Sequence, residues 1–219
     1  MKTKATLLIM LFLFSTTNLL VAQKKIQPYK NGDFRLELKL PHFNYLALNP
    51  NKEFKDAKFG FNGYGLGFEY NYRDKKFLEV STSFVMTFEL PFPAPVDAEY
   101  NKALSSFFIN LNDNIVKNRF TFGYGINYSA NTWNEWTRDF GDWNGDFDSI
   151  GRLTSSQKYT NRNLGLTFNS YFRLGKTIHI GLIYQPSLLN LNDNPKFIYE
   201  YLLSMEVSWR IKLFNTKRN

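Results

Sequence analysis

The segment from Leu203 to Leu213 alternates strictly between apolar and polar residues. Leucine, methionine, valine, tryptophan and isoleucine occupy one parity, and serine, glutamate, arginine and lysine occupy the other. Successive side chains of a β-strand point to opposite faces, so this pattern predicts a strand with one apolar and one charged face. The same reasoning predicts eight strands along the chain. They cover residues 33–40, 61–72, 77–90, 104–112, 119–130, 163–174, 177–185 and 199–214.

The connections between these strands alternate in length. Short turns are predicted at 73–76, 113–118 and 175–176, and long links at 41–60, 91–103, 131–162 and 186–198. Short turns on one rim and long loops on the other are typical of transmembrane β-barrels. The segment 104–112 also fits helical spacing, but an odd number of strands would leave an open edge in lipid. The pattern therefore predicts an all-β fold, an eight-stranded antiparallel up-and-down transmembrane β-barrel.

The two faces of the predicted strands differ in charge. The apolar parity contains no charged residue from Phe34 to Leu213, whereas the opposite parity carries both acids and bases. Lys or Arg near the bilayer midplane costs about 2–4 kcal/mol, so we expect the apolar face to contact lipid. Charges inside a narrow lumen must pair, because an unpaired buried charge costs several kcal/mol. We predict a plugged lumen with a charge network of Arg35, Glu37, Lys39, Glu69, Glu79, Glu89, Arg173, Glu206, Arg210 and Lys212.

A soluble secreted barrel of the lipocalin type is the alternative, because it has the same period with the apolar face turned inward. Many residues of the apolar face are aromatic, which makes that face too bulky for the interior of eight strands. The glycines within the strands lie instead on the polar parity, where crowded charged side chains need room. These glycines are Gly63, Gly65, Gly67, Gly123, Gly125, Gly165 and Gly181.

Composition adds information mainly at the N-terminus. Lys2 and Lys4 precede an apolar run at 7–14, and residues 15–23 lead towards a cleavage site, as in secretory signal peptides. We expect residues 1–22 to be the signal peptide and residues 23–219 to form the barrel domain. The chain contains no cysteine, which excludes disulfides, and its formal charge of +8 forms no continuous basic patch. We therefore expect an outer-membrane location and no nucleic-acid partner.

Candidate catalytic chemistry is sparse in this chain. Barrel enzymes that deacylate lipid A have a late-strand histidine followed two positions later by a serine, but His179 is followed by Ile180 and Gly181. The other histidine, His42, has no evident serine and acid beside it. We expect no catalytic residues and no cofactor, and a barrel enzyme acting on outer-membrane lipid is the alternative function.

The link 131–162 combines aromatic and acidic residues. Trp133, Trp136 and Trp143 are candidates for contact with an extracellular glycan or protein, because aromatic faces stack on sugars and anchor interfaces. Weaker candidates for a cation site are Asp142, Asn144, Asp146 and Asp148, whose oxygen-rich spacing suits calcium. The segment lacks the glycine and the bidentate glutamate of an EF-hand loop. Polar turns at a membrane rim are the simplest interpretation.

Three segments stand out: the glycine- and aromatic-rich segments Gly63–Tyr70 and Arg119–Gly125, and the final strand Leu203–Phe214. They resemble the small outer-membrane β-barrel proteins of Bacteroidota. The resemblance covers most of the chain after residue 22. It implies this fold in outer-membrane lipid, inserted by the barrel assembly machinery. We expect a monomer with a structural or interaction role at the cell surface. Such proteins usually end on an aromatic residue, whereas five residues follow Phe214 here.

Overall fold

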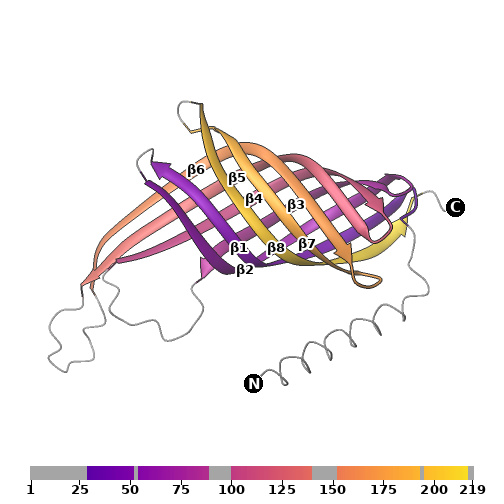
Figure 1. Cartoon of the computed structure of the whole chain (residues 1–219), viewed down its shortest axis with the longest axis horizontal. Helices are drawn as coiled ribbons and strands as arrows, with labels where there is room; N and C mark the ends of the chain where they lie inside the picture. The colour runs from indigo at the N-terminus through magenta and orange to yellow at the C-terminus, as the bar shows by residue number, and fades with distance from the viewer. Residues whose placement is uncertain (1–28, 52–53, 89–99, 140–151, 193–194, 217–219) are drawn as a thin grey trace, which may run out of the picture.

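The computed structural model describes residues 29–51, 54–88, 100–139, 152–192 and 195–216. It contains eight strands that pair in sequence order, and β1 pairs with β8 to close an antiparallel barrel (Figure 1). The strands are β1 (Asp33–Asn51), β2 (Phe54–Arg73), β3 (Lys76–Phe88), β4 (Tyr100–Lys117), β5 (Phe120–Asp139), β6 (Arg152–Arg173), β7 (Ile178–Asn190) and β8 (Lys196–Asn215). The predicted fold class is confirmed, and the ambiguous segment 104–112 lies within β4. No helix among the described residues is long and apolar enough to cross a membrane.

Several strands continue far into the predicted links. Only residues 52–53 separate β1 from β2, so the predicted link at 41–60 is wrong. Extra residues in the ladders explain the error: the β1–β8 register shifts between Pro41 and Phe43, and the β2–β3 register shifts between Phe61 and Gly63. A bulge reverses which parity faces the lumen, so the alternation on which the prediction rested breaks at these points.

Three tight turns lie at one end of the barrel, which we call the turn end. They connect β2 to β3, β4 to β5 and β6 to β7, and β1 begins and β8 ends beside them. Lys75 and Asn118 occupy the left-handed region with φ values of 63° and 59°, as short hairpin turns require. The opposite end, where β5 and β6 project together, is the loop end (Figure 1).

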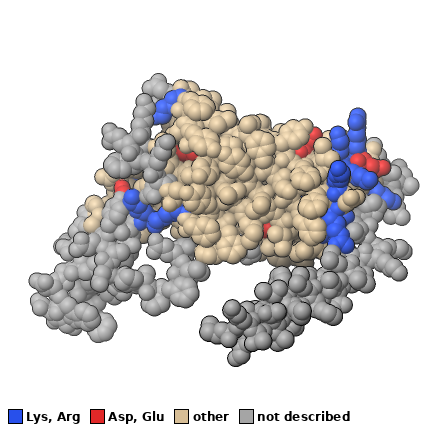
Figure 2. All heavy atoms as spheres, in the orientation of Figure 1, with Lys and Arg blue, Asp and Glu red and all other residues tan. Residues whose placement is uncertain are grey.

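The outer surface is apolar along its middle. Every described position of the predicted apolar parity is exposed or half-buried, including Tyr64 and Phe122, whereas Glu37 and Glu69 on the other parity have no exposed surface. Figure 2 shows a band of almost entirely uncharged residues between two ends that carry Lys and Arg. The predicted assignment of the faces is confirmed. The lipocalin-type alternative is wrong, because it requires the opposite orientation.

Aromatic side chains gather towards both ends of this band. At the turn end Phe34 stacks on Phe214 with 5.2 Å between ring centroids and lies 5.4 Å from Tyr70. The β1–β8 register shift between Phe34 and Arg35 brings Phe214 opposite Phe34. At the loop end, Tyr184, Tyr199, Tyr201 and Tyr45 form a chain of ring contacts 5.6–6.0 Å apart.

An apolar core fills part of the interior near the loop end. It is formed by Leu46, Leu48, Val85, Leu104, Phe108, Trp133 and Leu202, none more than 3% exposed. Because the interior here is apolar too, strand β1 is apolar on both faces beyond its bulge, and alternation cannot reveal it. This loop-end core was not predicted.

Candidate functional site in the barrel interior

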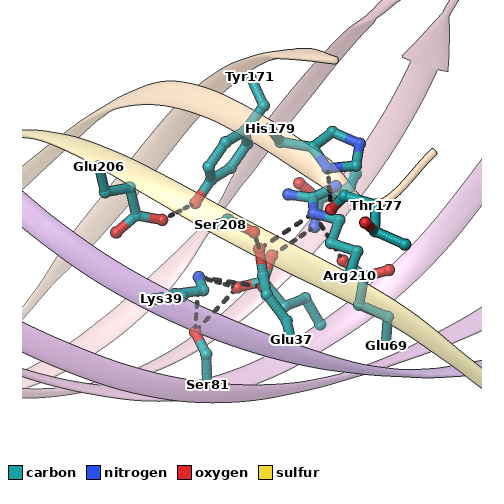
Figure 3. A network of polar contacts seen from close by, with 12 residues as sticks. Glu37, Lys39, Glu69, Ser81, Tyr171, Thr177, His179, Glu206, Ser208 and Arg210 are labelled. Carbon is teal, nitrogen blue, oxygen red and sulfur yellow. Dashed lines mark hydrogen bonds and ion pairs between the residues drawn. The ribbon is translucent and has the colours of Figure 1, made fainter. Parts of the chain in front are cut away.

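Five charged side chains meet in the middle of the barrel, and we call them the central cluster. Arg210 Nε lies 3.0 Å from Glu37 Oε1 and 3.1 Å from Glu69 Oε1. Lys39 Nζ lies 3.4 Å from Glu37 Oε2 (Figure 3). The Lys39 ammonium also contacts Glu79. The alternation of β1 places Glu37 and Lys39 on the inner face, and the β1–β8 register sets Glu37 opposite Arg210.

Neutral donors complete the central cluster, which has three carboxylates and two cations. The Ser208 hydroxyl donates to Glu37 Oε1 at 2.5 Å, and the Ser81 hydroxyl donates to Glu79 Oε1 at 2.9 Å. The Asn114 amide donates to Glu79 Oε2 at 3.2 Å. These bonds disperse the extra negative charge, which buried carboxylates require.

Tyr171 forms the wall beside the central cluster. Its hydroxyl donates to Glu206, and its ring lies 4.4 Å from the Arg210 guanidinium carbon (Figure 3). The ring passes over Gly181, where an added Cβ would collide with it. A side chain at Gly123 would likewise collide with Asn114 and Asn169. The expectation that lumen-facing glycines make room for crowded side chains is confirmed at these positions.

The turn end of the interior holds a second group of charges around Asp33. Arg35 and Lys212 lie 3.2 Å and 2.5 Å from the carboxylate oxygens of Asp33. Arg35 also lies over the ring of Tyr29, 3.7 Å from its centroid, and the Tyr29 hydroxyl lies 3.2 Å from His179 Nε2. A cavity of about 110 Å³ opens beside these side chains. Its lining residues are Tyr29, Arg35, Arg173, Lys176, Thr177, His179, Arg210 and Lys212.

A third polar centre lies near the loop end around Glu200, which is fully buried. Its carboxylate accepts hydrogen bonds from the Asn161 and Asn163 amides at 2.9 and 2.8 Å. The Asn131 amide and the Asn49 backbone N–H also donate to it, at 2.5 and 2.9 Å. Glu200 lies on the predicted lumen parity but is not among the predicted network residues. Its asparagine partners come from β1, β5 and β6.

Several hydrogen bonds cross the lumen between strands that are not neighbours. The Gln185 amide on β7 donates to Asn110 Oδ1 on β4 at 2.8 Å. The Asn161 amide on β6 donates to the carbonyl of Asn49 on β1 at 3.3 Å. Polar side chains therefore bridge the interior at more than one depth.

The remaining predicted network residues have different surroundings. Arg173 donates to the carbonyl of Asn118 at 3.1 Å and faces the turn-end cavity. Glu206 contacts Tyr171 rather than a cation, and the Lys212 side chain keeps 34% of its surface at the barrel mouth. Glu89 lies outside the described residues. Asp33, Tyr29 and Tyr171 were missed, although Asp33 lies on the charged parity.

The predicted contact loop at 131–162 requires correction. Strand β5 continues to Asp139 and β6 begins at Arg152, so much of that range is strand. Trp133 has the inward parity of β5, is 3% exposed and packs in the loop-end core, so it is not a surface contact residue. Trp136 lies on β5 and is half-buried. Trp143 lies outside the described residues, as do the cation candidates Asp142, Asn144, Asp146 and Asp148.

The histidine of β7 has no serine partner of the catalytic kind. Ser208 lies opposite His179 in the β7–β8 ladder, but its hydroxyl donates to Glu37. One ring nitrogen of His179 lies near the Thr177 carbonyl (Figure 3). The other lies near the Tyr29 hydroxyl. Ser208, His179 and Glu37 therefore do not form a Ser–His–acid relay. The side chain of His42 is outside the described part of the chain.

Comparisons with known proteins give structural likeness only. No family model matches the chain, and no curated protein sequence matches it. The crystal structure of Ail, the attachment invasion locus protein of Yersinia pestis, is similar with a TM-score of 0.53 at 10% identity, over 84% of this chain and 99% of Ail. Neisserial surface protein A gives a TM-score of 0.43 at 10% identity, over 82% of this chain and 97% of that protein. The likeness to Ail supports the fold of a small outer-membrane barrel, and nothing in these comparisons supports an assignment to Bacteroidota.

Proposed function

We propose that this protein is an integral outer-membrane β-barrel with an occluded interior, which has a structural or surface-interaction role. The observation that carries the proposal is the sorting of charge across the middle of the barrel wall. Outward positions within the predicted strand ranges carry no charge, and outward charges of the longer observed strands, such as Asp113 and Lys117 of β4, lie near the strand ends. The central cluster is buried inside. Soluble monomers rarely expose an apolar patch above about 600 Å², so a continuous apolar band requires a lipid environment.

The height of the apolar band agrees with this environment. Between the loop-end tyrosines Tyr199 and Tyr201 and the turn-end Phe214, the outward residues of β8 run from Leu203 to Leu213. Ten steps of about 3.4 Å at a tilt of about 40° rise about 26 Å, close to the apolar band of about 25 Å on outer-membrane barrels. The two aromatic groups, around Phe34 and around Tyr201, then lie near the two lipid–water interfaces. By this placement the turn end faces the periplasm and the loop end faces outward.

Extraction tests the membrane assignment. We expect the protein to fractionate with outer membranes, to need detergent for solubility and to migrate differently on gels before and after heating. A periplasmic protein that stays monodisperse without detergent would contradict it.

The bridged interior supports occlusion rather than conduction. Side chains of both charges fill the middle, the loop-end core lies above them, and cross-lumen bonds such as Gln185–Asn110 join opposite walls. Eight strands enclose space that side chains can fill. We therefore expect the pure protein to form no stable open pore in planar bilayers. Large, reproducible single-channel steps would instead favour a narrow ion path along the charged interior.

The loop end is the proposed place of surface contact. Strands β5 and β6 project there (Figure 1). Their polar side chains bond across the pair, with the Thr132 and Thr160 hydroxyls 3.2 Å apart. Tyr159 and Trp136 offer aromatic surface on this projection for a glycan or a protein. Replacing both by serine should leave folding intact and reduce binding of bacteria that express the protein to other cells or to glycans. Unchanged binding by the folded variant would remove this projection as the contact site.

A further inference from the structure

The turn-end cavity has the size and lining of a ligand site. It measures about 110 Å³ and lies inside the barrel mouth, between the central cluster and the β6–β7 turn. A buried water needs about 10–15 Å³ on this measure, so the cavity has room for a ligand several times larger than one water molecule. Five of its eight lining residues are cations: Arg35, Arg173, Lys176, Arg210 and Lys212.

The carboxylates near the cavity leave two of these cations without an acidic partner. Asp33 serves both Arg35 and Lys212, and Glu37 and Glu69 serve Arg210. No carboxylate among the described residues lies within 4.0 Å of Arg173 or Lys176. A walled cavity with excess positive charge attracts anions, because low-dielectric walls concentrate the field.

Unpartnered guanidinium atoms provide a second, independent observation. Arg173 and Arg210 are only 7% and 3% exposed. Arg173 Nε and both terminal nitrogens of Arg210 are buried and have no hydrogen-bond partner among the described residues. Buried charged donors are costly to leave unsatisfied, and guanidinium groups match oxyanions through paired N–H···O bonds.

We propose that this cavity binds a tetrahedral oxyanion of the phosphate class, either a free anion or the phosphoryl head of a lipid. Arg173 and Arg210 donate to its oxygens, and Lys176 lies exposed at the β6–β7 turn beside it. Tyr29 holds the wall in place, because its ring contacts Arg35 and its hydroxyl bonds to His179. The site is at the opposite end from the proposed surface contact and does not depend on it.

The test is titration calorimetry of the protein in dodecylmaltoside micelles with inorganic phosphate, against sodium chloride at equal ionic strength. We expect saturable one-site binding that Arg173→Gln weakens about tenfold or more, as loss of a charged hydrogen bond implies. Lys117→Gln removes an exposed charge from the same end but outside the cavity lining, and should bind as the wild type does.

A second cavity variant and a lipid competition complete the test. If Arg173→Gln does not fold, the exposed Lys176→Gln replaces it and should also weaken binding. Competition by phosphatidic acid, but not by phosphatidylcholine, in mixed micelles would identify a lipid head as the source; no competition would identify the free anion. The proposal is overturned if the wild type shows no saturable binding, or if the folded cavity variants bind phosphate as well as Lys117→Gln does.

Discussion

Replacing Arg210 by methionine tests the role of the central cluster in stability. The guanidinium lies 3.0 and 3.1 Å from two fully buried carboxylates, so its removal leaves Glu69 without a cation while Glu37 keeps Lys39. Removing one partner of a buried pair costs about 3–5 kcal/mol. Lost contact with the Tyr171 ring, 4.4 Å away, adds about 0.5–2 kcal/mol. We expect the free energy of unfolding to fall by at least about 3 kcal/mol.

Urea unfolding in micelles, followed by the fluorescence of the four tryptophans, measures this change. Arg119→Met removes a half-buried arginine at a turn and should stay within about 0.5 kcal/mol of the wild type. Adding Glu69→Gln to Arg210→Met removes the carboxylate left unpaired, so the double variant should be more stable than the single one. A single variant within about 1 kcal/mol of the wild type, or a double variant less stable than the single, would refute the reasoning.

Two further substitutions probe the barrel wall and the interior packing. Val207→Arg places a charge on the outward face of β8 and should make the free energy of barrel assembly about 2–4 kcal/mol less favourable, whereas Val207→Ile should assemble normally. Gel mobility before heating measures the assembled fraction of both variants. Normal assembly of the arginine variant would reverse the assigned faces. Gly181→Ala should cost about 1–3 kcal/mol in urea unfolding, because its Cβ collides with Tyr171. Gly175→Ala, which meets nothing within 4 Å, is the matched control, and equal stability of the two variants would contradict a crowded interior.

Alternation alone located all eight strands and the lipid-facing parity, because one face of each strand had to be apolar and the other polar. It failed where both faces carry similar residues. Strand β1 beyond His42 has Leu46 and Leu48 inside, so its alternation disappears although its pairing with β2 continues. Trp133 was misplaced for the same reason, because a tryptophan near a rim resembles an interface residue when the strand is taken to end at 130.

The sequence predicted which polar residues face the lumen better than it predicted which of them contact one another. Lumen parity identified Glu37, Lys39 and Arg210, but which charges meet depends on register and strand tilt, which the sequence does not state. Glu200 and Tyr171 illustrate the limit, because their partners lie on strands that are distant in sequence. The turn-end cavity depends on Tyr29, which precedes the first strand.

The most direct test of the central claim is the environment of the apolar band. The chain has no cysteine, so single cysteines at Val80 and Leu182 on the band, and at Lys75 on a turn, can each carry one spin label. The collision rate of each spin label with oxygen and with a water-soluble nickel chelate is measured for the protein in lipid vesicles. We predict that labels at Val80 and Leu182 collide more with oxygen than with the chelate, and that the label at Lys75 does the reverse. Equal access of the chelate to all three positions would contradict a lipid-facing band.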